Sequence, residues 1–450
     1  MSGKNRNKNT SILYGPYIIL GSALFTFLFP AFWLYSRITG RYRRHLGERL
    51  GFVPHGAVRR LSKHPRIWIH AVSLGEVQVA ASIIEALKRI MPGCSLIVST
   101  VTEHGRDLAV KIFGEEIPVV YAPVDLIGSV RIALSRVRPH AVVFLETEIW
   151  PAWLFEAHRM GIKTALINGR ISTRAIKRYL GLRPFFKEVL KYMDIFSMLT
   201  QEDAARITAM GGDPRKIEIN GNAKYDLLRS NADPTIETEM RRLLNLEAFQ
   251  RVFIAGSTRD GEESMVMDAY ERIIERYPDT ILIIAPRHIG RTPAIGDVIE
   301  ARGHTYQVRT DLGKPDSKRT AQIVIINTFG DLFKVYSIGT VVFCGGSLVP
   351  LGGQNPLEPA VWGKTVFYGP SMENFGDATA LLEAVGAGIR VSNPEILALK
   401  TIWFFGHPKE LASAGARARE AVLRKQGAAE KHAQAIKRLL KGNEDNLTTL

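Results

Sequence analysis

Cysteine is scarce in this 450-residue chain, which contains only Cys94 and Cys344. Two cysteines in apolar, strand-like stretches cannot form a disulfide framework, so a reducing compartment is the simpler interpretation. No cysteine/histidine cluster has the spacing of a zinc site. The chain also lacks a P-loop signature and a Gly-x-Gly-x-x-Gly motif after its first expected strand. These absences exclude disulfide-stapled, zinc-finger and standard dinucleotide-binding proteins.

The charge balance is basic, with a formal net charge of +15, whereas the hydrophobic content of 46% is ordinary for a globular protein. The length predicts two or three domains. A basic chain suits an anionic membrane surface, an anionic substrate or nucleic acid, although a basic surface without a function is also open. Because no nucleic-acid recognition module is recognisable, the first two partners remain.

The longest uncharged stretch lies near the N-terminus, between Lys8 and Arg37. It is long enough to cross a hydrocarbon core of about 30 Å, and longer than the apolar core of a secretory signal. Pro30 interrupts it, so a kinked helix or one lying in the membrane plane is also open. We expect residues 1–40 to be a membrane anchor. Arginines after the stretch weakly favour a body on the cytoplasmic side.

Short apolar runs alternate with helical patterns through the rest of the chain, which predicts parallel sheets covered by helices on both faces. The sequence therefore predicts two Rossmann-like domains, residues 41–228 and 229–425, followed by a C-terminal helix and tail, residues 426–450. The polar stretch 227–240 is interpreted as the linker. Expected strands lie at 66–70, 94–100, 117–122, 140–146, 163–168 and 194–200, then at 251–257, 280–286, 321–327, 340–346, 364–370 and 387–392.

Charged residues follow several expected strands of the first domain, where parallel sheets carry their ligands. They are Glu76, Glu146, Glu148, Arg170 and Lys224. A carboxylate in the first turn of a helix also has a purely structural explanation, the positive end of the helix dipole. Three acids and two bases at successive strand ends nevertheless favour a functional site.

The strand ends of the second domain have the features of a nucleotide site. Ser257 and Thr258 precede a helix whose free amides suit phosphate, although a simple capped turn is the alternative. Arg287 suits a phosphate or carboxylate, and Glu358 could accept the hydroxyls of a ribose. Because no Asp-x-Asp motif occurs anywhere in the chain, we expect the nucleotide to be held without a metal ion.

Five motifs, "AVSLGE", "ETEIWP", "GNAKYD", "APRH" and "GGSLVP" with "NPLEPA", occur in the order found in one family. From about residue 10 to residue 425 the chain resembles the 3-deoxy-D-manno-octulosonic acid (Kdo) transferases of lipopolysaccharide synthesis. The resemblance implies an α/β, GT-B glycosyltransferase fold with two Rossmann-like domains facing across a cleft. It implies inverting, metal-independent transfer of Kdo from CMP-Kdo to lipid IVA, without a cofactor. It also implies a place at the bacterial inner membrane, with the catalytic domains on the cytoplasmic face.

The resemblance also implies roles for individual residues. Glu76 matches the general base, and Glu146 with Lys224 matches a pair that supports the transition state. Gln354 stands where the family often has His, which puts an acid-base role there in doubt. The residues expected to bind CMP-Kdo are Ser257, Thr258, Pro286, Arg287, Phe329, Gly330, Asp331, Gly346, Ser347, Asn355, Pro356, Leu357 and Glu358.

The segment 170–190 mixes cations with aromatic and aliphatic residues, as interfacial helices do. We expect it to contact the lipid acceptor and the anionic leaflet, although a surface helix pair with its apolar face in the core is the alternative. The residues concerned are Arg170, Arg174, Arg178, Phe185 and Phe186. Two rival functions remain open: an enzyme like the nucleotide-sugar 2-epimerases, which would not need an anchor, and a membrane-anchored binding protein without chemistry.

Overall fold

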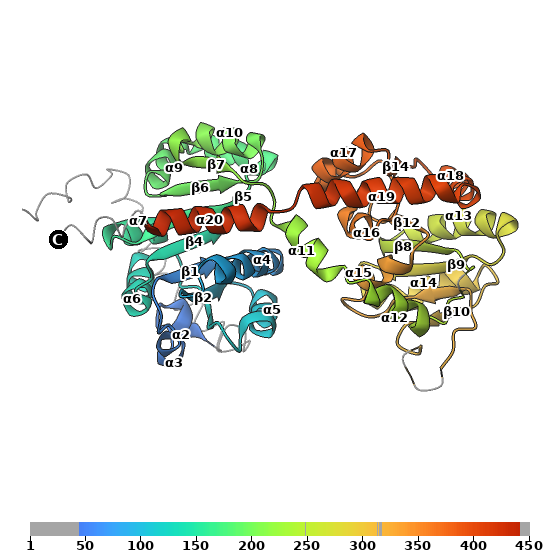
Figure 1. The fold of residues 1–450 in the computed structure, drawn as a ribbon, viewed down its shortest axis with the longest axis horizontal. Helices are drawn as coiled ribbons and strands as arrows, with labels where there is room; N and C mark the ends of the chain where they lie inside the picture. Colours follow the sequence, from blue (N-terminus) through green and yellow to red (C-terminus); the bar gives the residue numbers. More distant parts are fainter. Residues whose placement is uncertain (1–44, 248, 313, 315–316, 442–450) are drawn as a thin grey trace, which may run out of the picture. The chain divides into compact units, whose positions relative to one another are not determined.

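The computed structural model describes residues 45–441 except 248, 313 and 315–316 (Figure 1). The chain forms two compact units, one reaching to Leu227 and resuming at Gln426, the other running from Leu228 to Lys425. The expected anchor, residues 1–40, lies outside the described residues, as does the end of the tail. Within the described part of the chain, no helix is both long and apolar enough to cross a membrane.

The first unit contains a seven-stranded parallel sheet in the order β3-β2-β1-β4-β5-β6-β7. The strand order reverses between β1 and β4, the kind of position where open α/β sheets bind ligands. The strands are β1 (Arg66–His70), β2 (Ser95–Thr100), β3 (Val119–Tyr121), β4 (Ala141–Leu145), β5 (Lys163–Gly169), β6 (Ile195–Met198) and β7 (Ile217–Ile219).

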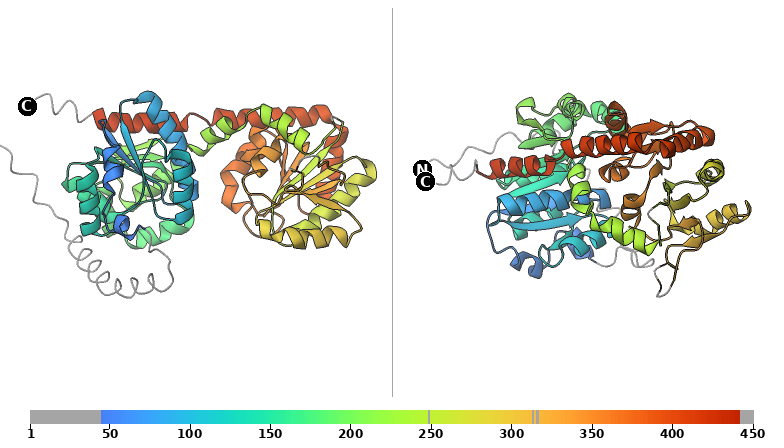
Figure 2. Two further views of the ribbon diagram at one scale, coloured as in Figure 1. Left: turned by 90° about the horizontal axis from the view of Figure 1, so that it is seen from below. Right: turned by 45° about the vertical axis from the view of Figure 1, so that its right-hand side comes forward.

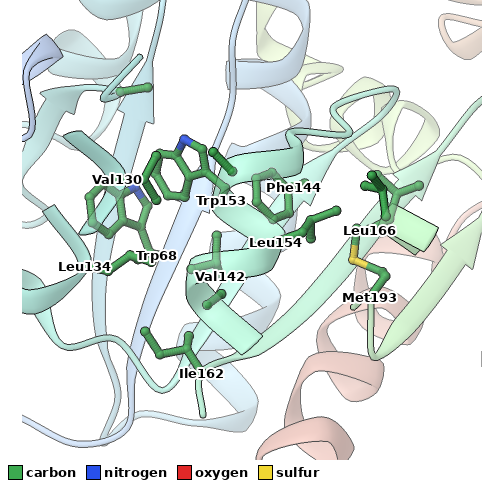
Figure 3. Close-up of a cluster of buried hydrophobic side chains, with 14 of the residues drawn as sticks. Trp68, Val130, Leu134, Val142, Phe144, Trp153, Leu154, Ile162, Leu166 and Met193 are labelled. Carbon is green, nitrogen blue, oxygen red and sulfur yellow. The ribbon is translucent and has the colours of Figure 1, made fainter. Parts of the chain in front are cut away.

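Helices cover both faces of this sheet because alternate strand residues point to opposite faces, and both sets are apolar. On one face lie α4 (Leu74–Ile90), α5 (Glu103–Phe113) and α20 (Ala428–Lys441). On the other lie α6 (Ile127–Val137), α7 (Pro151–Arg159), α9 (Arg183–Leu190) and α10 (Gln201–Met210), with α8 (Thr173–Gly181) beside them. Figure 3 shows the core between the sheet and this second group of helices, where Trp68 and Trp153 pack edge to face. The short helices α2 (Leu46–Arg49) and α3 (His55–Arg59) and the turn η1 (Pro214–Lys216) also belong to this unit.

The second unit repeats this architecture around a parallel sheet in the order β10-β11-β9-β8-β12-β13-β14. Taken by itself, each unit in Figure 2 has its strands between helices. The strands are β8 (Val252–Thr258), β9 (Ile281–Pro286), β10 (Tyr306–Val308), β11 (Ile323–Ile325), β12 (Val341–Cys344), β13 (Val366–Tyr368) and β14 (Gly388–Arg390). The helices and 3-10 turns are α11 (Lys224–Asn231), which leads into the unit, α12 (Thr235–Leu243), α13 (Glu262–Arg276), η2 (Ile289–Arg291), α14 (Thr292–Glu300), α15 (Leu332–Val335), η3 (Tyr336–Ile338), α16 (Leu357–Val361), η4 (Glu373–Phe375), α17 (Gly376–Ala384), α18 (Pro394–Gly406) and α19 (Pro408–Arg424).

The structure differs from the sequence interpretation at three places. The edge strands β7 and β10 were not expected, because a short, half-exposed edge strand has no continuous apolar run. The stretch 227–240, interpreted as a linker, lies mostly in α11 and α12, since Pro234 stands at the N-cap of α12, where proline does not break a helix. Helix α20, which the sequence interpretation gave as a segment of its own after the second domain, packs on the first unit.

Candidate functional site

Glu76 lies at the third position of α4, in the turn that follows β1. Its side chain is buried, with 7% of the residue's surface exposed. The backbone N–H of Val72 donates to Oε2 at 2.8 Å, and the Ser73 hydroxyl donates to Oε1 at 3.0 Å. Ser73 is the N-cap residue, yet its hydroxyl bonds to Glu76 and not to a helix amide. The turn therefore orients this carboxyl group.

The environment of Glu76 raises the pKa of its carboxyl group to about 7. Burial is the main cause, and the nearby carboxylates of Glu148 and Glu146 add to it, while the bonds from Val72 and Ser73 oppose it. A carboxyl group that titrates near neutral pH can take a proton efficiently from a hydroxyl group.

Glu146 follows β4 directly and forms an ion pair with Lys224, the first residue of α11, at 2.6 Å between Oε1 and Nζ. Its backbone is left-handed, with φ of 54°. A non-glycine residue in this conformation carries strain, which folds tend to keep where a side chain must be aimed. Since β1 and β4 are neighbours, the electrostatic contacts join Glu76, Glu146 and Glu148 at the point where the strand order reverses.

Asn168 belongs to this site, although the sequence interpretation missed it. It lies at an irregularity at the end of β5, has φ of 53°, and is fully buried. Its Oδ1 accepts the backbone N–H of Ala223 at 2.9 Å, immediately before Lys224. Its Nδ2 has no hydrogen-bond partner among the described residues. The signal available in the sequence was the Asn-Gly pair at a strand end, because asparagine and glycine tolerate left-handed backbone.

Two other expected residues lie at the edge of this cluster. Glu148 accepts a hydrogen bond from the indole of Trp150, and burial raises the pKa of its carboxyl group. The backbone N–H of Arg170 donates to the carbonyl of Glu146 at 3.2 Å, while its side chain is exposed. Arg170 therefore supports the Glu146 turn through its main chain.

In the second unit a buried carboxylate binds the backbone amides of the glycine-rich loop that contains Gly346 and Ser347, two residues expected to bind CMP-Kdo. Glu262, at the start of α13, accepts backbone N–H bonds from Gly346, Ser347 and Leu348 at 2.5, 2.9 and 2.9 Å, and one from Arg259 at 2.9 Å. The amides of Gly346 and Ser347 are therefore not free in this structure. The sequence interpretation missed Glu262 in this role, because the loop amides that it binds are 84 or more residues away in the chain.

The turn after β8 is similarly engaged. Ser257 has a left-handed backbone with φ of 55°, and Thr258 is fully buried. The Thr258 hydroxyl donates to Glu263 at 3.1 Å, and Glu263 pairs with Arg291 at 3.1 Å. The hydroxyl of Thr258 is thus committed to a neighbouring carboxylate.

Glu358 and Arg287 lie close enough to interact electrostatically. Burial raises the pKa of the Glu358 carboxyl group, opposed by the Asn355 side-chain bond at 3.3 Å and by the Arg287 charge. Helix α16 (Leu357–Val361) has Pro356 at its N-cap and Glu358 in its first turn. Pro286 ends β9 immediately before Arg287.

The loop with Phe329 and Gly330 precedes α15. The Thr328 hydroxyl donates to Asp331 at 2.6 Å, and Arg309 pairs with the same oxygen at 3.4 Å. Phe329 is 89% exposed, which leaves its ring free to stack on a planar ligand. Among the residues that the structure describes, no group of three or more His, Cys, Asp or Glu side chains is placed to hold a metal ion.

The segment expected at the membrane forms α8 and α9. Phe185 and Phe186 are half-buried and pack against the core of the first unit, so they are not its most exposed apolar groups. Leu180 and Leu182 are 42% and 55% exposed instead. Arg178 is exposed, and the side chain of Arg174 lies outside what the structure describes.

Comparison with known proteins gives consistent relatives. A family model described as 3-deoxy-D-manno-octulosonic-acid transferase (kdotransferase) matches residues 44–227. A bifunctional glycosyltransferase/methyltransferase of Fusobacterium nucleatum is 33% identical over 75% of this chain, which spans only 52% of that longer relative. The 3-deoxy-D-manno-octulosonic acid transferase of Bordetella pertussis is 27% identical over 93% of this chain and 96% of its own length.

Solved structures extend the likeness of the fold. UDP-GlcNAc 2-epimerase from Neisseria meningitidis, bound to UDP-GlcNAc, matches 84% of this chain and 100% of its own, with a TM-score of 0.59 and 14% identity. At that identity the match shows a shared fold and nothing about activity. Two parallel seven-stranded sheets give the chain a GT-B-like α/β fold. With the matching transferase model and relatives, these observations place the chain in the 3-deoxy-D-manno-octulosonic-acid transferase family of glycosyltransferases.

Proposed function

We propose that this protein transfers Kdo from CMP-Kdo to lipid IVA and releases CMP, without a divalent metal ion. The observation that carries this is the buried Glu76, whose pKa is raised to about 7, beside the Glu146–Lys224 ion pair. The first unit, which contains all three residues, also contains the region that matches the family model. CMP-Kdo as donor and lipid IVA as acceptor follow from the sequence resemblance.

The reaction needs one base and compensation for the charge of the leaving group. Glu76 takes the proton of an acceptor hydroxyl as its oxygen attacks the anomeric carbon of Kdo. The bond from that carbon to the CMP phosphate oxygen breaks, and its electron pair leaves with CMP. A single displacement of this kind inverts the anomeric centre. Lys224 and Arg287 are the cations assigned to stabilise the developing negative charge.

The acceptor is a lipid, so the first unit is proposed to dock on an anionic leaflet. The exposed stripe on α8 and α9 supports this, because cations lie beside exposed aliphatic side chains there. Lys177, Arg178, Leu180, Leu182, Arg183 and Lys187 make up this stripe. Together with the N-terminal anchor expected from the sequence, it supports our proposal that the enzyme works at the cytoplasmic face of the bacterial inner membrane.

The decisive experiment measures CMP release and the lipid product together. Purified protein is given CMP-Kdo alone, lipid IVA alone, or both, with the Glu76→Gln protein as the matched control for spontaneous donor breakdown. We expect enzyme-dependent CMP only with both substrates, and a lipid whose mass has increased by one or more Kdo units. Donor conversion without acceptor would favour an epimerase-like activity, and binding without CMP release would favour a non-catalytic protein.

A further inference from the structure

The C-terminal helix α20 bonds to the turn that carries Lys224. His432 of this helix is fully buried, with Nε2 3.0 Å from the carbonyl oxygen of Gly221 and Nδ1 2.7 Å from the Ser197 hydroxyl. A carbonyl oxygen can only accept, so Nε2 carries the proton and Nδ1 accepts the hydroxyl hydrogen. The Ser197 oxygen also accepts from Asn220 at 2.6 Å. Residues 220–221 are therefore held from two sides.

Asp226 holds the other end of the same turn. Its two carboxylate oxygens accept the backbone N–H groups of Gly427 and Ala429, at 2.6 and 2.8 Å. These amides lie at the start of α20, where a carboxylate is favoured by unpaired donors and by the helix dipole. Between the two attachments Ala223 is buried in the same core as Ala429. Lys224 thus lies between two bonded anchors on one helix.

The chain path makes this arrangement more than a surface contact. The chain leaves the first unit after Leu227 and returns to it at Gln426. The bond between Asp226 and Gly427 therefore links the segment that leaves the unit to the segment that returns. In Figure 1, α20 runs along the first unit beside α4, the helix that begins with the Glu76 turn, and the two helices share one core. Helix α20 therefore contacts the elements that carry both parts of the candidate site.

We propose that α20 is a positioning element for Lys224, in which Asp226 and His432 hold the turn that presents the ammonium group to Glu146. This inference rests on the role proposed above for Lys224. A lysine has a long flexible stem, so the position of its ammonium group depends on a fixed backbone. A displacement of about 1 Å at a catalytic group can lower a rate by about 100-fold. Burial lowers the pKa of His432 to about 4, which keeps the ring neutral at working pH.

The test compares His432→Leu and Asp226→Asn with Lys437→Met. Lys437 also attaches α20 to the first unit, by donating to the carbonyl oxygen of Ile90 at 3.0 Å, and Ile90 lies at the end of α4 opposite Glu76. We expect the first two changes to lower kcat by about tenfold, with KM for both substrates within about twofold, whereas Lys437→Met leaves kcat near wild type. His432→Gln, which can donate to Gly221 and accept from Ser197, should recover most of the loss.

Two further readouts separate positioning from loss of fold. Amide hydrogen exchange should rise in residues 220–227 of His432→Leu, without a matching rise in β1 or β4. In a Lys224→Ala background, Asp226→Asn should lower kcat no further, since the group it positions is gone. An active Lys224→Ala protein would refute the role of Lys224 itself. The positioning role is tested separately, with Lys224→Ala inactive. It is refuted if the folded His432→Leu and Asp226→Asn proteins keep the full kcat, or if amide exchange in residues 220–227 does not change. Equal losses in both backgrounds would also refute it.

Discussion

At the residue scale, Glu76 experiences two opposed influences. Hydrogen bonds from Val72 and Ser73 favour its charged form, and burial together with Glu148 and Glu146 favours the neutral one. Because burial is the largest influence, the group titrates near neutral pH. Burying Glu76 in its charged form therefore lowers the stability of the protein, and it also gives the carboxylate a pKa suited to a general base. Such shifted pKa values are common at active sites.

Glu76→Gln should reduce transfer to less than about one hundredth of the wild-type rate while leaving CMP binding nearly unchanged, because the amide cannot accept the proton. Glutamine can still accept from Val72 and donate to Ser73, so the fold should survive. Turnover above about a tenth of wild type would remove Glu76 from the role of base. CMP titration by calorimetry is the control.

The same substitution should stabilise the protein at high pH. The folded pKa is about 7 and the ordinary value 4.5, so the folded state binds more protons between these values. Wild-type stability should therefore fall as pH rises through this window, by up to about 3 kcal/mol for this group, and Glu76→Gln should abolish that fall. Urea unfolding at pH 5 and pH 8 measures it. An equal effect of the substitution at both values would contradict the shifted pKa.

The pH–rate profile gives an independent check. The rate should rise with pH to a plateau, with a midpoint near 7, because only the ionised carboxylate accepts a proton. Glu148→Gln removes one of the charges that raise the Glu76 pKa, so the midpoint should move to lower pH. It should stay above 4.5, since burial remains. A midpoint that Glu148→Gln leaves in place would show that the two carboxyl groups do not interact.

At the element scale, the glycine-rich loop after β12 is held by Glu262, the first residue of α13. One buried carboxylate accepts the amides of Gly346, Ser347 and Leu348. Glu262→Gln puts an NH₂ group against some of these donors and should lower the free energy of unfolding by about 2 kcal/mol or more. It should also raise KM for CMP-Kdo more than KM for the acceptor, because the loop precedes Asn355 and Glu358. Unchanged unfolding and unchanged KM would refute this.

The helices α8 and α9 provide a second test at this scale. In a form that lacks residues 1–36, Leu180→Ser with Leu182→Ser should abolish binding to anionic vesicles, because these exposed side chains lose their contact with the bilayer. The matched control is Leu399→Ser, an exposed leucine on α18 of the second unit. Phe185 and Phe186 are unsuitable because they pack against the core. Retained binding by the double variant would exclude this stripe as the docking surface.

At the scale of the whole molecule, transfer is expected to need no added metal. The sequence lacks an Asp-x-Asp motif, and Lys224 and Arg287 are the cations assigned to the leaving group. Activity after exhaustive chelation, with CMP-Kdo prepared separately, should equal that before it. Loss of activity that magnesium restores would show that the phosphate site has been misinterpreted.

The sequence alone was sufficient for the architecture of each unit. Parallel strands buried on both faces leave continuous apolar runs, so the central strands were recognisable, whereas the edge strands β7 and β10 lack that signal. Carboxyl ends of parallel strands share one edge of the sheet, so Glu76, Glu146 and Lys224 could be grouped before any coordinates. Ordered motifs then identified the family.

Only the tertiary structure decided which polar groups are free and which are occupied. No local pattern reveals that Glu262 takes the amides of the loop 346–348, or that Asn168 accepts the N–H of Ala223, because these partners lie 55 or more residues apart. The same holds for His432 and Gly221. Such bonds depend on how the chain returns on itself, and burial, which sets the pKa of Glu76, exists only once the core has formed.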